Sequence, residues 1–185
     1  MTVTQTDLAG VLVLEPRVFS DARGAFFESF RADRCAAMGV GAAFVQDNVS
    51  ISRRGVLRGL HFQHPRGQAK LIQAIRGEVF DVAVDVRRDS PTFGRAVWST
   101  LSEANRRQMF VPPGFAHGFV VTSDEAIVAY KCSDYYAPEF ERSIHWNDPA
   151  LGIPWPVASP ILSSKDESAP LLSALSSHLL PRFAG

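Results

Sequence analysis

Proline and glycine interrupt this chain at short intervals, and their spacing is the feature that most constrains its fold. The 185 residues include 12 prolines and 13 glycines, spread throughout rather than gathered into a linker. Proline and glycine both disfavour helix interiors, so the segments between them are poor candidates for long helices. Short apolar segments bounded by turn residues are typical of strands. The spacing therefore favours a fold built from many short strands.

The clearest predicted strand covers residues 78–86. Its large apolar side chains occupy the even positions 80–86, while Asp81, Ala83 and Asp85 occupy the odd ones. Side chains alternate between the two faces of a strand, so this pattern separates an apolar face from a more polar one. Further strands are expected at 115–121 and 126–131, joined by a turn at Ser123-Asp124, and at 10–14, 44–50, 69–75 and 96–100.

Helical signals are few. Residues 31–38 are expected to form a two-turn helix that Gly39 ends, and residues 171–180 a second short helix. Because strands dominate, the sequence predicts an all-β domain over residues 1–185, either a β-sandwich or a barrel of jelly-roll type. Such folds bind ligands in the mouth or lumen of the barrel, so inward polar side chains are the candidates for chemistry.

Charge and cysteine content exclude several classes of partner. Lys and Arg total 19, as do Asp and Glu, so the whole molecule has no charge surplus to attract nucleic acid or an anionic membrane. No apolar run approaches the roughly 18 residues that span a bilayer, and the N-terminus lacks a secretory-signal pattern. Cys35 and Cys132 are too few for a disulfide framework. We expect a cytoplasmic protein in which a local cluster of cations would hold any anionic ligand.

Reactive side chains are concentrated in three stretches. In residues 56–63, a regular strand would place Arg58 and His61 on opposite faces, but Gly59 permits a bulge that brings both to one pocket. From periodicity alone, a structural His61 with a solvated Arg58 is the favoured alternative. In residues 111–119, His117 follows a Pro-Pro-Gly turn and opens a strand.

The third stretch surrounds Tyr130, whose ring is expected to point inward because it shares a strand face with Val128 and Cys132. A core tyrosine bonded to backbone is the alternative. His61, His64 and His117 also suggest a metal site, but no Glu follows at a ligand-like interval, which disfavours a catalytic metal. Taken singly, these stretches do not identify a reaction.

Taken together, they resemble one family in order along the chain. The sequence is similar to the dTDP-4-dehydrorhamnose 3,5-epimerases over residues 14–166. The resemblance rests on Phe-Ser-Asp-Ala-Arg-Gly-Ala-Phe-Phe-Glu at 19–28, Gln-Asp-Asn at 46–48, Arg-Gly-Leu-His-Phe-Gln at 58–63, Pro-Pro-Gly-Phe-Ala-His-Gly-Phe at 112–119, Tyr-Lys-Cys-Ser-Asp-Tyr-Tyr at 130–136, Trp-Asn-Asp-Pro at 146–149, Ile-Pro-Trp-Pro at 153–156 and Ile-Leu-Ser-Ser-Lys-Asp at 161–166.

The resemblance implies a cupin-like jelly roll that is usually a homodimer and uses neither a metal nor another cofactor. It also implies a substrate, dTDP-4-dehydro-6-deoxy-D-glucose, in the dTDP-L-rhamnose pathway. The C4 ketone of this sugar acidifies the hydrogens at C3 and C5, so both centres can invert through an enolate. Inversion needs a base on one face of the sugar, a proton donor on the other, and positive charge at the developing oxyanion.

The same resemblance assigns roles to individual residues. His61 matches the base, Asp166 the carboxylate that orients it, Tyr130 the proton donor, and Lys70 the cation near the ketone oxygen. The substrate-binding positions are Arg23, Arg58 and Lys165 for the pyrophosphate or neighbouring groups, Gln46, Asp47, Asn48 and His117 along the pocket, Tyr136 for stacking on thymine, and Phe19, Glu28 and Glu141 near the nucleotide.

Two alternatives stay open at this stage. A related epimerase that inverts only C3 could use the same base and donor, and a metal- or sugar-binding cupin would require the matched residues to be structural. The loop at 64–69 is also one residue shorter than a longer form in the family, although Lys70 still precedes an apolar strand. Some N-terminal binding residues are expected to reach the site of a neighbouring subunit.

Overall fold

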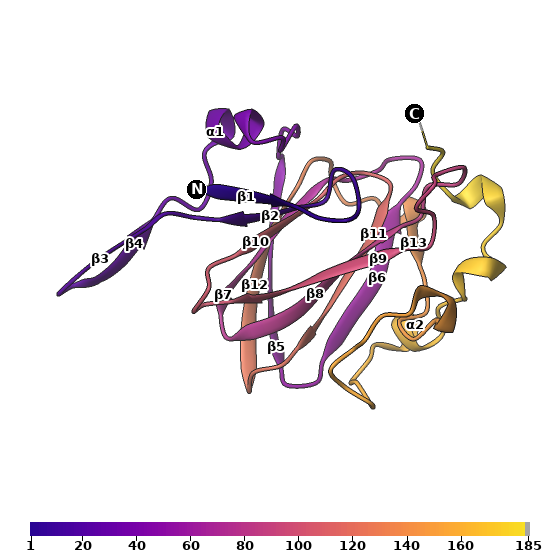
Figure 1. Ribbon diagram of the computed structural model, residues 1–185. Helices are drawn as coiled ribbons and strands as arrows, with labels where there is room; N and C mark the ends of the chain where they lie inside the picture. Colours follow the sequence, from indigo (N-terminus) through magenta and orange to yellow (C-terminus); the bar gives the residue numbers. More distant parts are fainter. Residues whose placement is uncertain (184–185) are drawn as a thin grey trace.

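Two antiparallel sheets form the body of the protein in the computed structural model, which describes residues 1–183 (Figure 1). Ala184 and Gly185, the end of the expected domain, lie outside the described residues. The first sheet has the order β1 (Thr2–Gln5), β2 (Leu12–Glu15), β10 (Gln108–Val111), β7 (Lys70–Arg76), β12 (Glu125–Cys132), β5 (Gln46–Arg53). The second has the order β13 (Glu141–Ser143), β6 (Leu57–Gln63), β11 (Phe115–Val121), β8 (Glu78–Asp85), β9 (Ala96–Ser102). The predicted all-β sandwich is confirmed.

The remaining elements lie outside these sheets. Strands β3 (Val18–Asp21) and β4 (Gly24–Phe27) form a hairpin that projects away from the sandwich (Figure 1). Helix α1 (Ala32–Ala37) confirms the first expected helix. No helix within residues 1–183 is long and apolar enough to cross a membrane. The other helical segments are α2 (Ser164–Glu167), η1 (Pro138–Phe140), η2 (Pro149–Leu151), η3 (Leu172–Ala174) and η4 (Ser177–Leu179).

The continuous helix expected at 171–180 was wrong, because this segment forms only the short 3-10 turns η3 and η4. Extended residues precede both turns, at Leu171 and Ser176. Each turn brings one leucine, Leu172 or Leu180, into the apolar cluster on the second sheet. Because serine is a modest helix former, the serines of this segment favour a continuous helix only weakly. The packing of the two leucines therefore decides the local conformation.

Strand β8 shows how the core is arranged. Val79 and Ala83 pack between the two sheets, whereas Val82 and Val84 pack on the outer side of the second sheet, beneath the C-terminal segment. The predicted alternation is confirmed, but both faces of β8 are buried. Asp81, on the face between the sheets, is fully buried as well. A carboxylate in that position requires a polar partner.

Candidate active site

A bulge in β6 brings Arg58 and His61 to the same cavity, as the family resemblance implies and contrary to the arrangement that periodicity alone favours. Between the pairs His117–His61 and Phe119–Arg58, β11 advances two residues and β6 advances three. Gly59 has a φ of +114°, and a Cβ at this position would lie 2.6 Å from the carbonyl oxygen of His117. Only glycine accommodates this conformation and close approach without strain. The extra residue offsets the alternation that would otherwise separate the two side chains.

Two adjoining cavities, of about 410 and 290 Å³, open beside this bulge. Both are lined by His61, Lys70 and Tyr130, so the three side chains stand where the cavities meet. The larger cavity adds Arg58, His117, Lys165 and Asp166, and the smaller adds Gln46, Asn48, Tyr136 and Glu141. Eleven of the fifteen residues that the sequence singled out therefore line one continuous site.

Asp166 approaches His61 from the C-terminal segment. Ile161 donates its N–H to Gly55 and accepts one from Leu57, which docks the segment beside β6. Ser163 then caps α2 by accepting the N–H of Asp166. The resulting His61 Nε2 to Asp166 Oδ1 distance is 2.5 Å. The chain 105 residues downstream thus supplies a buried carboxylate to the histidine.

Burial alone would raise the pKa of Asp166, but the hydrogen bonds with His61 and Ser163 outweigh it and lower the pKa below its usual value. Asp166 is therefore ionised near neutral pH. An ionised carboxylate beside an imidazole orients the ring and stabilises the imidazolium that forms when the ring takes up a proton. The pair has the properties required of a general base.

Tyr130 and Lys70 come from neighbouring strands of the first sheet, β12 and β7. Burial raises the pKa of Tyr130, so its hydroxyl keeps its proton at neutral pH. Burial lowers the pKa of Lys70. Within residues 1–183, Lys70 forms no ion pair with an acidic side chain. The site thus offers a protonated hydroxyl and a lysine amine that a ligand can engage.

The mouth of the smaller cavity is lined by a chain of polar contacts. Tyr136 Oη donates to Glu141 Oε2 at 2.9 Å, and Lys165 Nζ lies 2.8 Å from Glu141 Oε1. The hydrogen bond with Glu141 raises the pKa of Tyr136. Burial would raise the pKa of Glu141, but the bonds from Lys165 and Tyr136 lower it below its usual value. In the same cavity, Gln46 Nε2 donates to Asn48 Oδ1 at 3.1 Å.

His117 pairs with Asp81, a residue that was not among the predicted site residues. Its Nε2 lies 2.9 Å from Asp81 Oδ2, and both side chains are buried. Asp81 lies in β8, beside β11, with its backbone opposite Phe119. A carboxylate between apolar residues in the middle of a strand was the signal that could have identified it. Groups of three or more His, Cys, Asp or Glu side chains able to hold a metal are absent among residues 1–183.

Four of the expected binding residues lie away from these cavities. Phe19 and Arg23 are on the projecting hairpin, where Arg23 is 90% exposed and pairs with Asp21. Glu28 follows the hairpin and pairs with Arg34 at 3.0 Å. Asp47 lies 3.0 Å from Lys131, on an exposed part of β5. Their binding roles stay predictions. In a single chain, the positions of these four residues do not bring them to the two cavities.

Comparison with known proteins identifies the family. The family model described as dTDP-4-dehydrorhamnose 3,5-epimerase matches residues 5–174. The chain belongs to this family. A dTDP-4-dehydrorhamnose 3,5-epimerase from Pseudomonas aeruginosa is 55% identical over 168 residues, covering 90% of this chain and 93% of the relative. The chain is accordingly an isomerase of the epimerase type.

Solved structures of family members share the fold. A dTDP-6-deoxy-D-glucose-3,5-epimerase from Legionella pneumophila, in complex with dTDP-4-keto-L-rhamnose, has a TM-score of 0.97 and 49% identity, covering 100% of this chain and 99% of that one. A 3'-monoepimerase from Streptomyces bikiniensis, in complex with dTDP-quinovose, has a TM-score of 0.89 and 39% identity, covering 96% and 91%. The fold is therefore common to double and single epimerases.

Proposed function

We propose that the protein epimerises dTDP-4-dehydro-6-deoxy-D-glucose at both C3 and C5, giving dTDP-4-dehydro-L-rhamnose without a metal or other cofactor. The observation that carries the proposal is the convergence of His61, Lys70 and Tyr130 where the two cavities meet. These side chains match the base, oxyanion partner and acid that inversion beside a ketone requires.

In the proposed reaction, His61 removes the proton from the carbon beside the C4 ketone, and the electron pair moves to the ketone oxygen to form an enolate. The Lys70 ammonium stabilises the negative charge on that oxygen. Tyr130 then donates a proton to the opposite face of the carbon, which inverts the centre. Asp166 holds the His61 imidazolium until it releases its proton to solvent, and the Tyr130 phenolate takes up a proton from solvent. The restored pair then acts in the same way at the second carbon.

The surrounding residues would hold the nucleotide. Arg58 and Lys165 line the larger cavity and supply cations for the pyrophosphate. Tyr136, half exposed at the mouth of the smaller cavity, offers its ring for stacking on thymine. Gln46, Asn48, His117 and Glu141 are the remaining proposed contacts from this chain.

Solvent exchange in deuterium oxide tests the reaction. Incubation with dTDP-4-dehydro-6-deoxy-D-glucose over many turnovers is expected to place deuterium at both C3 and C5, because each inversion returns a proton that has exchanged with solvent. Exchange at C3 alone would contradict double epimerisation and identify a 3-epimerase, the second candidate. Chelator treatment is expected to leave the rate unchanged, and a rate restored only by added metal would contradict the cofactor-free reaction.

We further propose that the active form is a homodimer. The outer face of the first sheet exposes Val49, Ile51 and Ile75, at 66%, 64% and 50%. Phe26 on the projecting hairpin is 71% exposed. A large apolar patch of this kind is typical of a protein interface. A partner bound there would cover the patch, and exchanged hairpins would carry Phe19 and Arg23 toward the partner's site.

The proposed location is the cytoplasm. Cys35 and Cys132 are both buried and unpaired. Free thiols suit a reducing compartment, where disulfides are rare. Fractionation of source cells is expected to recover the protein with cytoplasmic markers, and recovery in an extracytoplasmic fraction would contradict this.

A further inference from the structure

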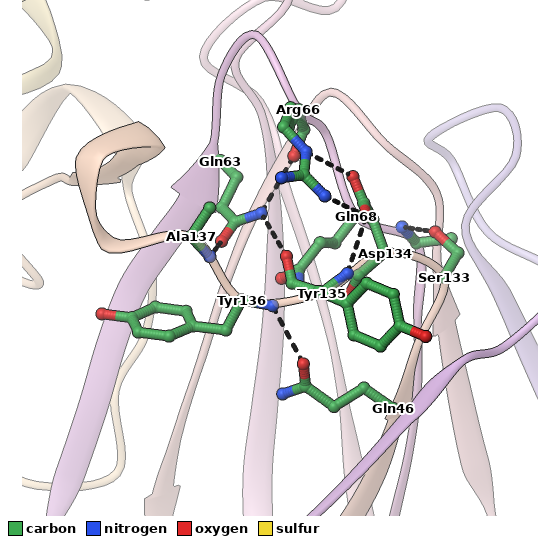
Figure 2. A network of polar contacts seen from close by, with 10 residues as sticks. Gln46, Gln63, Arg66, Gln68, Ser133, Asp134, Tyr135, Tyr136 and Ala137 are labelled. Carbon is green, nitrogen blue, oxygen red and sulfur yellow. Dashed lines mark hydrogen bonds and ion pairs between the residues drawn. The ribbon is translucent and has the colours of Figure 1, made fainter.

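The segment 133–137, which carries Tyr136, is held in place by side chains from distant parts of the fold (Figure 2). Tyr136 donates its N–H to Gln46 Oε1 at 2.9 Å, and Ala137 donates to Gln63 Oε1 at 2.8 Å. The carbonyl of Asp134 accepts from Gln68 Nε2 at 2.7 Å. Three glutamines therefore satisfy backbone groups that a strand partner would satisfy in a sheet.

Gln63 contacts three residues of this network through its side chain. It is 6% exposed and lies in β6 two residues after His61. Besides accepting from Ala137, it donates through Nε2 to the carbonyls of Arg66, at 3.0 Å, and Tyr135, at 3.4 Å. One buried carboxamide thus fixes the backbone on both sides of Tyr136 and ties it to the loop at 64–69.

That loop adds a second attachment. Arg66 Nε lies 2.9 Å from Asp134 Oδ2, and Arg66 also donates to Oδ1 of the same carboxylate. The bonds from Arg66 and from the N–H of Tyr135 lower the pKa of Asp134. In Figure 2 the rings of Tyr135 and Tyr136 extend in opposite directions from the segment. The network therefore selects which of the two rings faces Glu141 and the cavity.

We propose that Gln63 and Arg66 are positioning residues that hold the Tyr136 ring ready for the nucleotide base. Arg66 lines neither cavity, and Gln63, which lines the smaller one, has both ends of its carboxamide bonded to backbone, so both should set nucleotide affinity rather than the rate of proton transfer. The inference rests on the proposed function, in which Tyr136 stacks on thymine. It also gives the short loop at 64–69 a role.

A double-mutant cycle between Gln63 and Tyr136 tests the inference. Gln63→Ala is expected to raise the Kd for dTDP and the KM about tenfold, because the ring must then be ordered during binding. The kcat at saturation should stay within about twofold, since the chemical step is untouched. Tyr136→Ala should weaken binding at least as much. The double variant should then be no weaker than Tyr136→Ala, because Gln63 acts only through the ring.

Arg54→Ala is the matched control. Arg54 forms the same kind of surface pair, 2.9 Å from Asp124, in the turn between β5 and β6, and it lines neither cavity. Its loss should leave Kd, KM and kcat unchanged. If Gln63→Ala does not fold, the same double-mutant cycle can be measured between Tyr136 and the exposed Arg66, with Arg66→Ala in place of Gln63→Ala. Arg66→Lys keeps one charge contact and should restore part of the affinity.

Three results would overturn the inference. Additive losses in the double variant would show that Gln63 does not act through Tyr136. A fall in kcat with unchanged Kd would place Gln63 in the chemical step. If Arg54→Ala and Arg66→Ala had equal effects, a general loss of stability would explain both, and Arg66 would have no specific positioning role. Wild-type protein that fails to bind dTDP would overturn the proposed function as well, whereas the first three results leave it standing.

Discussion

Two histidines line the same cavity, each held by its own buried aspartate. His61 pairs with Asp166, and His117 pairs with Asp81. The side chain of His61 is 24% exposed, whereas that of His117 is 7% exposed. A base must reach the carbon from which it takes a proton, so the more accessible ring is better placed for that role. His117 is better suited to a fixed contact with the ligand.

This difference predicts the behaviour of a single variant. His61→Ala should lower kcat by about 10²–10⁴-fold, the usual contribution of a general base. Its Kd for dTDP should change little, because proton abstraction belongs to the chemical step. Steady-state kinetics and calorimetry measure the two effects. Replacement of the exposed His178 serves as the control. Near-normal turnover by His61→Ala would remove His61 from the proposed role.

Among the structural elements, β6 does most to assemble the site. Its bulge turns Arg58 and His61 to one side, and a Cβ at Gly59 would lie 2.6 Å from the carbonyl oxygen of His117. Gly118 on β11 has the reciprocal constraint, because a Cβ there would lie 2.7 Å from the carbonyl of Arg58. Two glycines facing each other therefore let the strands meet at the bulge.

Gly59→Ala should consequently affect both stability and activity. A left-handed φ and a backbone clash are expected to lower the free energy of unfolding by about 1–3 kcal/mol. Relief of the clash would shift the bulge, so kcat should fall as well. Urea unfolding and steady-state kinetics test this against Gly41→Ala, where the added Cβ meets no atom within 4 Å. Equal stability of the two variants would contradict the strain.

The sequence predicted some elements well because their signals are local. Alternation identified β8, and a glycine between Arg58 and His61 marked the place where a bulge was possible. The Asp81–His117 pair and the attachments of Gln63 were not predicted, since contacts between distant segments leave no periodic pattern. The hairpin of Phe19 and Arg23 shows the same limit, because its sequence motif does not specify which cavity it serves.

For the whole molecule, equal numbers of acidic and basic residues conceal an uneven distribution. Arg58, Lys70 and Lys165 gather at the site, although the formal net charge is zero. The apolar patch on the outer face of the first sheet is a local excess of exposed apolar side chains. Surface composition averaged over the molecule hides both features. The patch leads to a prediction about assembly.

In sedimentation experiments, the wild-type protein should have a molecular mass about twice the chain mass of 20.3 kDa. Ile51→Glu should shift the population toward monomer and reduce activity, because a charge would be buried in the interface. Leu171→Glu, an exposed apolar position outside the patch, is the control and should stay dimeric. Analytical ultracentrifugation with parallel assays separates the outcomes. A fully active wild-type monomer would contradict the homodimer.

The position of Gln63 two residues after His61 has one more consequence. The same strand anchors the group assigned to the sugar carbon and, through Gln63, the ring assigned to the nucleobase. In the proposed function, β6 therefore sets the distance between the two groups that would engage the two ends of the ligand. We therefore expect a sugar nucleotide with one phosphate fewer to bind more weakly, because it would be too short to engage both ends at once.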